Sequence, residues 1–353
     1  MIKILHSADW HLDAPLNMQK AEQSQWLRKK MLEIPEKIVS LCKSESCDML
    51  VLSGDLFDGH CSGDTLRLVK DALEEVAIPV FISPGNHDFV APNSPWADLQ
   101  WPENVHIFRR QEVESVAVPQ LDCRVYGAAF TSMDCPALLE GFQAEQTEKY
   151  AIGVFHGDPT QVNSTYCPIT TRQIADSGLD YLALGHIHKG DQVKSGKTLC
   201  AWPGCPMGHG YDELGEKGVL LVSLDSEVTT RLVSLQGPQF HDLQIPATED
   251  LGQILPPVGS DDFYRITFIG ASEPVDISAV SKKYPQFPNL ELRDKTTPPI
   301  DVWASAGKDT FEGVYFSLLQ AALEDADEQT MEQIALAAKI SRQLLDGQEV
   351  VLP

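Results

Sequence analysis

Short apolar runs and longer amphipathic stretches alternate along the first 240 residues of the chain. The apolar runs are rich in β-branched residues and end near Gly, Asp or His, which predicts strands. We expect these strands at 2–7, 49–53, 80–83, 105–108, 125–129, 152–155 and 181–184. Amphipathic spacing predicts helices at about 23–42 and 65–76. Strands and helices that alternate in this way indicate an α/β body.

Beyond residue 181, apolar runs at 198–202, 219–224 and 231–235 follow one another without a helical stretch between them. This spacing predicts hairpin-linked strands, so we expect the sheets to become partly antiparallel. Residues 190–198 (GDQVKSGKT) resemble a phosphate-binding loop, but five residues separate the glycines where that motif has four. We interpret the segment as a Gly-Lys hairpin turn between two strands.

The last third of the chain has a different pattern. Four prolines fall within 236–257, and we expect a linker at 241–260. Strands are predicted at 263–269 and 290–293 with a helix near 276–283 between them, and two helices follow at about 310–323 and 328–345. The sequence therefore predicts a body at 1–240 and a smaller second domain at 261–353.

Composition limits the class of protein. With 353 residues and about 150 residues per domain, two domains are expected. Hydrophobic residues make up 43%, and no stretch of about 18 apolar residues predicts a membrane span. The amino terminus MIKILHSADWH lacks a signal-peptide pattern. The eight cysteines are scattered without a CxxC pair, which is typical of reduced thiols in a cytoplasmic protein.

The charge balance is strongly acidic. Lys and Arg number 27 and Asp and Glu number 51, so the net charge is −24. This argues against a general affinity for nucleic-acid backbones, which needs clustered Lys and Arg. A nuclease is not excluded, because bound metal ions supply positive charge locally.

Metal-type side chains gather where five predicted strands end. They are Asp9 with His11, the GDLFD segment 54–58, the GNHD segment 85–88, His156 and the GHIH segment 185–188. The carboxyl ends of strands in an open α/β sheet are where sites assemble. A single DxH, GD or HxH is a weak signal, because each also occurs in a turn or as a packed histidine. The ordered set predicts one metal site.

The motifs offer seven ligands of two kinds, oxygens and imidazole nitrogens, without a thiolate. They are Asp9, Asp55, Asn86, His11, His156, His186 and His188. This donor set suits Mn, Fe, Zn or Mg and not copper(I) or an iron–sulfur cluster. Seven ligands are too many for one ion and fit two ions that share a carboxylate, as in sites for in-line displacement at phosphorus. His87 is left over and is expected to protonate the leaving oxygen.

The order DxH, GD, GNHD, H and GHxH resembles the calcineurin-like metallophosphoesterases. The stretches ILHSADWHLDAPL, VLSGDLFDG, FISPGNHD, YLALGHIHKGD and WPGCPMGHGYDELGEKGVLLV also resemble the SbcD-type branch of DNA repair exonucleases, in its YhaO-like group. The resemblance covers residues 1–235. It implies an α/β fold of four layers, in which two central mixed β-sheets are flanked by helices. A small C-terminal α+β capping domain would follow.

The resemblance also implies how the site is divided. One ion would be held by Asp9, His11, Asp55 and His188, and the other by Asp55, Asn86, His156 and His186, so that Asp55 bridges. His87 would contact the phosphate and protonate the leaving group. Asp58 would orient His87, as an acid at this position does in related phosphatases, although some nucleases of the branch have histidine there.

The resemblance favours a DNA exonuclease or single-strand endonuclease with Mn as its ion, acting as a homodimer with a coiled-coil ATPase partner of the SMC type. Because the chain is short beside typical members, we expect the segment that grips the ATPase to be reduced or absent.

Two other functions stay open. One is a phosphoesterase for nucleotides or other small phosphodiesters. The charge favours it, since residues 241–353 hold 8 basic and 19 acidic residues, a net of −11. The other is a non-catalytic partner-binding subunit with a vestigial site, which is less consistent because no ligand is missing.

Three further histidines complete the set of candidates. His60 follows the GDLFDG loop and His209 lies in the PMGHGYDE loop, and both are considered as substrate contacts. The simpler interpretation of His60 is an exposed loop position. The simpler interpretation of His209 is a role without substrate contact. His6, inside the first predicted strand, is expected to be packed or hydrogen-bonded.

Overall fold

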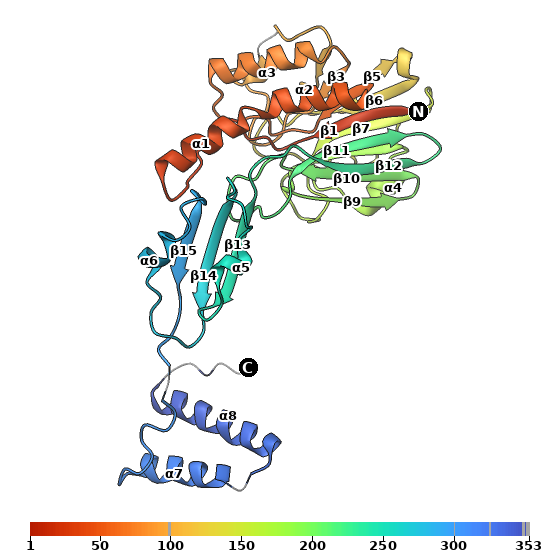
Figure 1. The fold of residues 1–353 in the computed structure, drawn as a ribbon. Coiled ribbons are helices and arrows are strands. Elements are labelled where there is room, and N and C mark those ends of the chain that lie inside the picture. The colour runs from red at the N-terminus through yellow and green to blue at the C-terminus, as the bar shows by residue number, and fades with distance from the viewer. Residues whose placement is uncertain (98–99, 300, 325, 348–349, 351–353) are drawn as a thin grey trace. The chain divides into compact units, whose positions relative to one another are not determined.

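The computed structural model describes residues 1–97, 100–299, 301–324, 326–347 and 350, and Figure 1 shows its helices and strands. The chain divides into two compact units. The first comprises 1–243, 256–265 and 285–291, and the second comprises 244–255, 266–284 and 292–353. Within the described residues, no helix has the length and apolar character needed to span a membrane.

A six-stranded sheet in the order β12-β11-β1-β2-β3-β4 carries the first three motifs at its strand ends. β1 (Ile2–Ser7), β2 (Met49–Leu52), β3 (Val80–Ile82) and β4 (Val105–Ile107) run parallel. β11 (Gly218–Leu224) pairs antiparallel with β1, and β12 (Val228–Ser234) pairs antiparallel with β11. The sheet is therefore mixed, as predicted.

A second six-stranded sheet has the order β5-β6-β7-β8-β10-β9 and carries the remaining motifs. β6 (Cys123–Gly127), β7 (Tyr150–His156), β8 (Tyr181–Gly185) and β10 (Thr198–Gly204) run parallel. The antiparallel edges are β5 (Glu114–Val118) and β9 (Lys189–Ser195). β9 and β10 form a hairpin around Gly196 and Lys197, so the turn predicted there is confirmed.

The two sheets pack face to face with helices outside them. Side chains of both sheets, such as Ile4, Val51, Ile152 and Val154, share one buried apolar cluster. A second cluster joins the other face of the first sheet to α1 (Ala21–Met31), α2 (Ile34–Glu45) and α3 (Gly63–Glu75), and a third joins α4 (Thr171–Asp176) to the second sheet. Alternate residues of a strand face opposite sides, which lets one strand serve two cores. The predicted arrangement of two mixed sheets flanked by helices is confirmed.

Several local predictions need correction. The single helix expected at 23–42 is two helices, α1 and α2, because Pro35 occupies the first turn of α2 and cannot continue a preceding helix. The strands β10 and β11, expected as hairpin neighbours, belong to different sheets. The segment 205–217 between them crosses from one sheet to the other. The strands β5 and β9 and the short helix α4 were not predicted, since β5 and β9 are exposed edges and α4 has only six residues.

His6 links the two sheets from within, as its position inside β1 suggests. Its Nδ1 lies 2.7 Å from the Tyr181 hydroxyl of β8, and its Nε2 lies 2.7 Å from the Ser53 hydroxyl after β2. Burial lowers the pKa of His6 to about 3, so the ring is neutral. The expectation of a packed, hydrogen-bonded histidine is confirmed.

The remaining elements follow β12. A three-stranded sheet has the order β13-β14-β15, with β13 at Phe240–Pro246, β14 at Phe263–Ile269 and β15 at Leu290–Asp294. The short helices α5 (Leu251–Ile254) and α6 (Ile277–Ser281) lie between these strands in the chain, and α7 (Phe311–Glu324) and α8 (Glu328–Leu345) follow them. The expected linker 241–260 thus contains β13 and α5. It escaped detection because β13 buries only Phe240 and Ile245, without strand alternation. The predicted domain division stays a prediction.

Candidate metal centre

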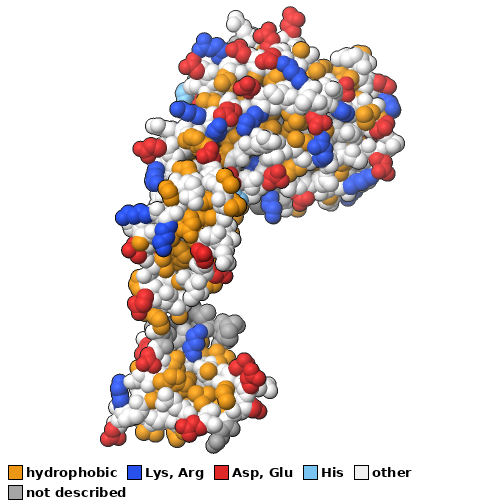
Figure 2. All heavy atoms as spheres, viewed as in Figure 1, with side chains coloured by type: hydrophobic (Ala, Val, Ile, Leu, Met, Phe, Trp, Pro, Cys, Tyr) orange, Lys and Arg blue, Asp and Glu red, His pale blue; other side chains and the backbone are white. Residues whose placement is uncertain are grey.

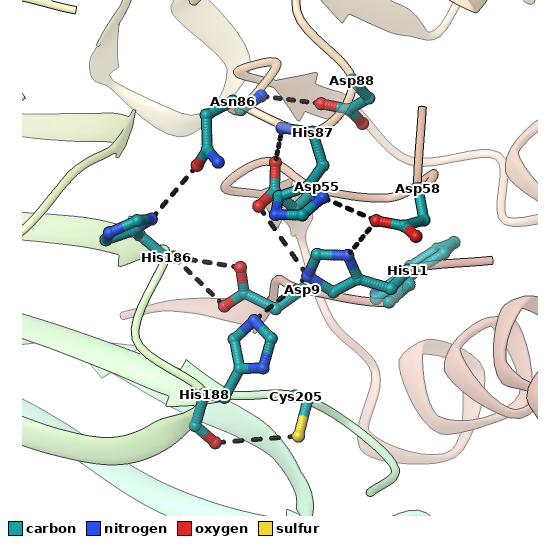
Figure 3. A network of polar contacts seen from close by, with 12 residues as sticks. Asp9, His11, Asp55, Asp58, Asn86, His87, Asp88, His186, His188 and Cys205 are labelled. Atoms are coloured by element: carbon teal, nitrogen blue, oxygen red, sulfur yellow. Dashed lines mark hydrogen bonds and ion pairs between the residues drawn. The ribbon is translucent and has the colours of Figure 1, made fainter. Parts of the chain in front are cut away.

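The ligand motifs meet where the carboxyl ends of both large sheets converge (Figure 3). Asp9 and His11 follow β1, Asp55 follows β2 and Asn86 follows β3, all in the first sheet. From the second sheet, His156 ends β7, and His186 and His188 follow β8. Most of these side chains are buried, whereas His186 and His188 are partly exposed. The centre is therefore open to solvent on one side.

The backbone around the centre is held in unusual conformations. Asp9, His11, Asp55 and His186 have positive φ values of 54°, 45°, 52° and 97°. Such values are costly for residues other than glycine and persist where the surroundings impose them, commonly at functional sites. The amide of Asp9 donates to the Gly54 carbonyl at 3.0 Å, and the amide of His11 donates to the Asp55 carbonyl at 3.0 Å. These bonds join the first two ligand loops.

A first group of ligand atoms comes from Asp9, His11 and His188, which lie within 4.8 Å of one another. The Nε2 atoms of His11 and His188 are 3.1 Å apart. Nδ1 of His11 faces the Asp58 carboxylate at 3.3 Å, and Nδ1 of His188 contacts the Glu213 carboxylate. Because each Nδ1 carries the proton that its carboxylate accepts, the two Nε2 lone pairs face each other. His11 and His188 could hold a cation through these two nitrogens.

A second group comes from Asp55, Asn86, His156 and His186. Nδ1 of His156 donates to the Ser53 carbonyl at 2.9 Å. Its Nε2 then faces two acceptors, Asn86 Oδ1 at 2.9 Å and Asp55 Oδ2 at 3.3 Å. Burial opposes the charge of His156, yet the neighbouring Asp55 carboxylate raises its pKa to about 9. Acceptors that converge in this way fit a divalent cation.

Two carboxylates lie between the groups. Oδ2 of Asp55 is 3.3 Å from His156 Nε2 and 3.8 Å from His11 Nε2, a position from which it can serve both groups. Oδ1 of Asp55 accepts the His87 amide at 2.9 Å. Asp9 accepts the His186 amide at 3.0 and 3.2 Å. Nδ1 of His186 lies 3.1 Å from Asn86 Oδ1, so all seven predicted ligands are brought together. Their division between two ions, with Asp55 as the bridge, stays a prediction.

His87 lies beside the ligands without belonging to either group. Its side chain is 44% exposed, and its Nδ1 is 2.6 Å from Asp58 Oδ1. The hydrogen bond to Asp58 raises the pKa of His87, and the hydrogen bonds from His11 and His87 hold the pKa of Asp58 well below its usual range. Asp58 therefore contacts both His87, the predicted acid, and His11, a predicted ligand, whereas the sequence suggested only the contact with His87.

Two buried acids escaped the sequence analysis. Asp88 accepts the Leu56 amide at 2.8 Å, the Phe57 amide at 3.3 Å and the Gly85 amide at 2.8 Å, so it ties the GDLFD loop to the GNHD loop. The GNHD motif itself could have pointed to it. Glu213 binds His188 and His209. Glu213 ends the PMGHGYDE segment that carries His209, but no periodicity or motif spacing pairs it with His188.

The two predicted substrate histidines lie in different surroundings. His209 is mostly buried, with its ring centroid 5.4 Å from that of His11. Its Nδ1 is 2.7 Å from Glu213, and its Nε2 is 3.3 Å from the Trp10 carbonyl. His60 is exposed on the loop after Asp58. A substrate contact stays a prediction for both.

A family model and a bacterial relative match large parts of this chain. The family model described as calcineurin-like phosphoesterase matches residues 2–190. The "Uncharacterized metallophosphoesterase YhaO" of Bacillus subtilis (strain 168) is 29% identical over 255 residues, which cover 69% of this chain. The chain spans 61% of the length of that relative.

Solved structures of low identity also match. The TT1561 protein of Thermus thermophilus is 16% identical with a TM-score of 0.42 and covers 65% of this chain and 98% of its own. A dimetal phosphatase from Danio rerio is 13% identical with a TM-score of 0.44 and covers 66% of this chain and 99% of its own. The family model, by contrast, spans more than half of the chain and includes every predicted ligand. The chain therefore belongs to the calcineurin-like phosphoesterase family.

Proposed function

We propose that the chain is a two-metal phosphodiesterase. The observation that carries this proposal is the His87–Asp58 pair, held at 2.6 Å beside a convergent set of Asp, Asn and His ligands. The ligand set fits two divalent cations, and the family supports hydrolysis of phosphoesters. A metal site without hydrolytic function would need the ligands but not an exposed histidine oriented by a carboxylate.

The chain's own residues would divide the work. When bound, the two cations would neutralise the phosphate oxygens and supply hydroxide at neutral pH. Asp58 holds His87 through Nδ1, which leaves Nε2 as the atom that passes a proton to the leaving oxygen. The Ser53 carbonyl, Asp58 and Glu213 hold the rings of His156, His11 and His188 in place.

We propose DNA as the substrate, cleaved by an SbcD-like exonuclease or single-strand endonuclease activity with Mn²⁺. The resemblance of the sequence motifs to the SbcD-type exonucleases supports this choice. A homodimer and a coiled-coil ATPase partner of the SMC type belong to the same proposal, as does a cytoplasmic location. Figure 2 shows Lys and Arg side chains scattered among acidic ones on the face in view, so metal ions would supply the local positive charge for a DNA backbone.

A second candidate, a phosphodiesterase for nucleotides or other small diesters, is favoured by the groove next to the centre. This groove has a volume of about 640 Å³ and reaches from Asp58 and His209 to Asp212, Arg265 and Glu291. The charge of Arg265 is already paired with Asp242 at 3.5 Å and with Glu291 at 3.4 Å. The groove thus has three carboxylates, from Asp58, Asp212 and Glu291, beside an arginine whose charge is already paired. Such a groove suits a neutral leaving group better than a polyanionic strand.

One assay separates the two candidates. Purified protein with Mn²⁺ is given end-labelled single-stranded and duplex DNA at low salt and, in parallel, bis(p-nitrophenyl) phosphate. His87→Ala tests the proposed acid. His241→Ala is the matched control, because His241 is a half-buried histidine paired with Asp262 outside the centre.

The outcomes are distinct. Shortening of DNA by wild type and His241→Ala, but not by His87→Ala, supports the nuclease. Hydrolysis of the aryl diester without cleavage of DNA supports the small-diester candidate. Failure on both substrates by a protein that binds Mn²⁺ contradicts the phosphodiesterase proposal.

A further inference from the structure

Glu213 is a buried carboxylate on the segment 205–217, which crosses between the two sheets. Its side chain is 8% exposed. One oxygen contacts His188 Nδ1. The other accepts the His209 amide at 2.7 Å, His209 Nδ1 at 2.7 Å and the Cys205 thiol at 3.3 Å. Both oxygens of the carboxylate are therefore occupied by donors that belong to or adjoin the metal centre.

His209 extends this arrangement to the opposite ligand loop. Its Nε2 lies 3.3 Å from the carbonyl oxygen of Trp10, the residue between Asp9 and His11. A continuous path of polar contacts thus runs from His188 through Glu213 and His209 to the backbone of the Asp9–His11 loop. His188 comes from the second sheet, and Asp9 and His11 come from the first. The path therefore fixes the position of His188 relative to Asp9 and His11.

The same residues could instead form a separate metal site. Ligand atoms of His188, Cys205, His209 and Glu213 lie within 4.8 Å of one another. The hydrogen bonds argue against it, because both Glu213 oxygens already accept N–H or S–H donors. A cation there would have to displace the protons that hold the two imidazoles. A positioning role leaves both Glu213 oxygens and the Nδ1 atoms of His188 and His209 with a hydrogen-bond partner.

We propose that Glu213 is a positioning residue for the first ligand group. It fixes the Nδ1–H tautomer and ring orientation of His188, so that Nε2 points toward Asp9 and His11. Through His209 it also steadies the backbone that carries those two ligands. This inference rests on the proposed two-metal function. Carboxylates that orient a ligating histidine in this way typically change metal affinity about 10–100-fold when removed.

The test is Mn²⁺ binding by the full chain, measured by calorimetry after removal of metal with a chelator. Wild type is expected to bind two ions. Glu213→Gln is expected to bind one of them about 10–100-fold more weakly and to keep the other. Glu148→Gln is the matched control, because Glu148 is a little-exposed acid paired with Arg124 at 2.9 Å away from the centre. It is expected to bind as wild type does.

Activity gives a second readout with a specific form. If Glu213 acts through ligand position, raising the Mn²⁺ concentration restores kcat of Glu213→Gln toward the wild-type value. A purely structural defect would not respond to Mn²⁺ in this way. If Glu213→Gln fails to fold, His209→Ala replaces it. This variant removes the contact between His209 and the Trp10 carbonyl but keeps the contact between Glu213 and His188. His209→Ala is expected to weaken the binding of the same ion by a smaller factor than Glu213→Gln does.

The outcomes separate this inference from the proposed function. Unchanged Mn²⁺ affinity in Glu213→Gln, or in His209→Ala where that variant replaces it, overturns the positioning role and leaves the two-metal centre intact. Failure of wild type to bind two ions overturns the proposed function itself. Binding of a third ion that is lost in both Glu213→Gln and Cys205→Ser overturns the positioning role in favour of a separate metal site.

Discussion

At the scale of single residues, the centre depends on which ring nitrogen each histidine turns inward. His11, His156 and His188 each place Nδ1 against an oxygen of the protein and Nε2 toward other ligands. His87 shares this device, with Asp58 on its Nδ1, but stays exposed. The predicted ligand His11 and the predicted acid His87 thus share a carboxylate on Nδ1 and differ in exposure, since the His11 side chain is buried and the His87 side chain is exposed.

His87→Ala is expected to lower kcat about 10²–10⁴-fold, the usual contribution of a positioned acid. Mn²⁺ affinity is expected to stay unchanged, because His87 is not one of the predicted ligands. The loss depends on the leaving group, since p-nitrophenolate needs a proton less than an alkoxide does. Kinetics on an aryl and an alkyl diester measure this, and an equal loss on both would argue against the role of acid.

Asp58→Asn is expected to lower both kcat and the affinity for one Mn²⁺, because Asp58 contacts His87 at 2.6 Å and His11 at 3.3 Å. We expect each effect to be about 10–100-fold. Titration of activity with Mn²⁺ separates them, since saturating metal restores only the part that acts through His11. If saturating metal restores kcat fully, Asp58 has no effect through His87.

At the scale of elements, the centre requires close contact between strand ends of different sheets. β7 and β8 run side by side, with His156 opposite Gly185. A Cβ at Gly185 would lie 2.1 Å from the Ser53 carbonyl and 3.0 Å from His156 Nδ1. The glycine of the GHIH motif is therefore a packing requirement between the two sheets.

Gly185→Ala is expected to lower the free energy of unfolding by about 1–3 kcal/mol, typical of overpacking a tight site. It should also weaken Mn²⁺ binding, because His156 must move. Gly63→Ala is the control, since a Cβ at Gly63, at the start of α3, would meet nothing within 4 Å. Urea unfolding of the metal-free proteins measures the difference. Equal stability of Gly185→Ala and wild type would contradict the packing requirement. It would show that the two sheets can move apart at Gly185 without a cost in the free energy of unfolding.

At the scale of the whole molecule, the two large sheets are joined by an apolar cluster that includes Ile4, Val51 and Val154. His6 adds polar bonds across the same interface, to Tyr181 and Ser53. The Ser53 carbonyl in turn accepts His156 Nδ1. The interface between the sheets thus connects directly to the candidate metal centre through Ser53.

Acid is expected to destabilise the fold through His6. Burial lowers its pKa to about 3, whereas an unfolded histidine has a pKa of about 6.5. Below pH 6.5 the unfolded chain takes up a proton that the folded chain does not, so stability falls as the pH falls from 6.5 toward 3. Between pH 7.5 and 5.5 this contributes a loss of about 1.4 kcal/mol.

Urea unfolding of metal-free wild type and His6→Gln at both pH values measures this contribution. His6→Gln is expected to show a smaller loss than wild type over the same range. Tyr181→Phe is the control, because it removes the hydroxyl that bonds His6 and keeps the titrating ring. Equal pH dependence of His6→Gln and wild type would contradict the assignment.

The sequence by itself determined the parallel strands β1, β2, β3 and β4 of the first sheet, the ligand motifs that follow strands of both sheets and the expectation of a two-metal site. These features are local, because a strand pattern and the residues that follow it lie within a few positions of each other. The same holds for α8 and β14, whose predicted bounds agree with the structure.

Only the tertiary structure decided how distant segments complete the centre. Glu213 meets His188 across 25 positions, and His209 meets Trp10 across 199. It also decided that β10 and β11 belong to different sheets, which places the segment with Glu213 over the site. Such contacts depend on packing between the sheets, and hydrophobic periodicity carries no information about which buried acid a distant histidine will meet.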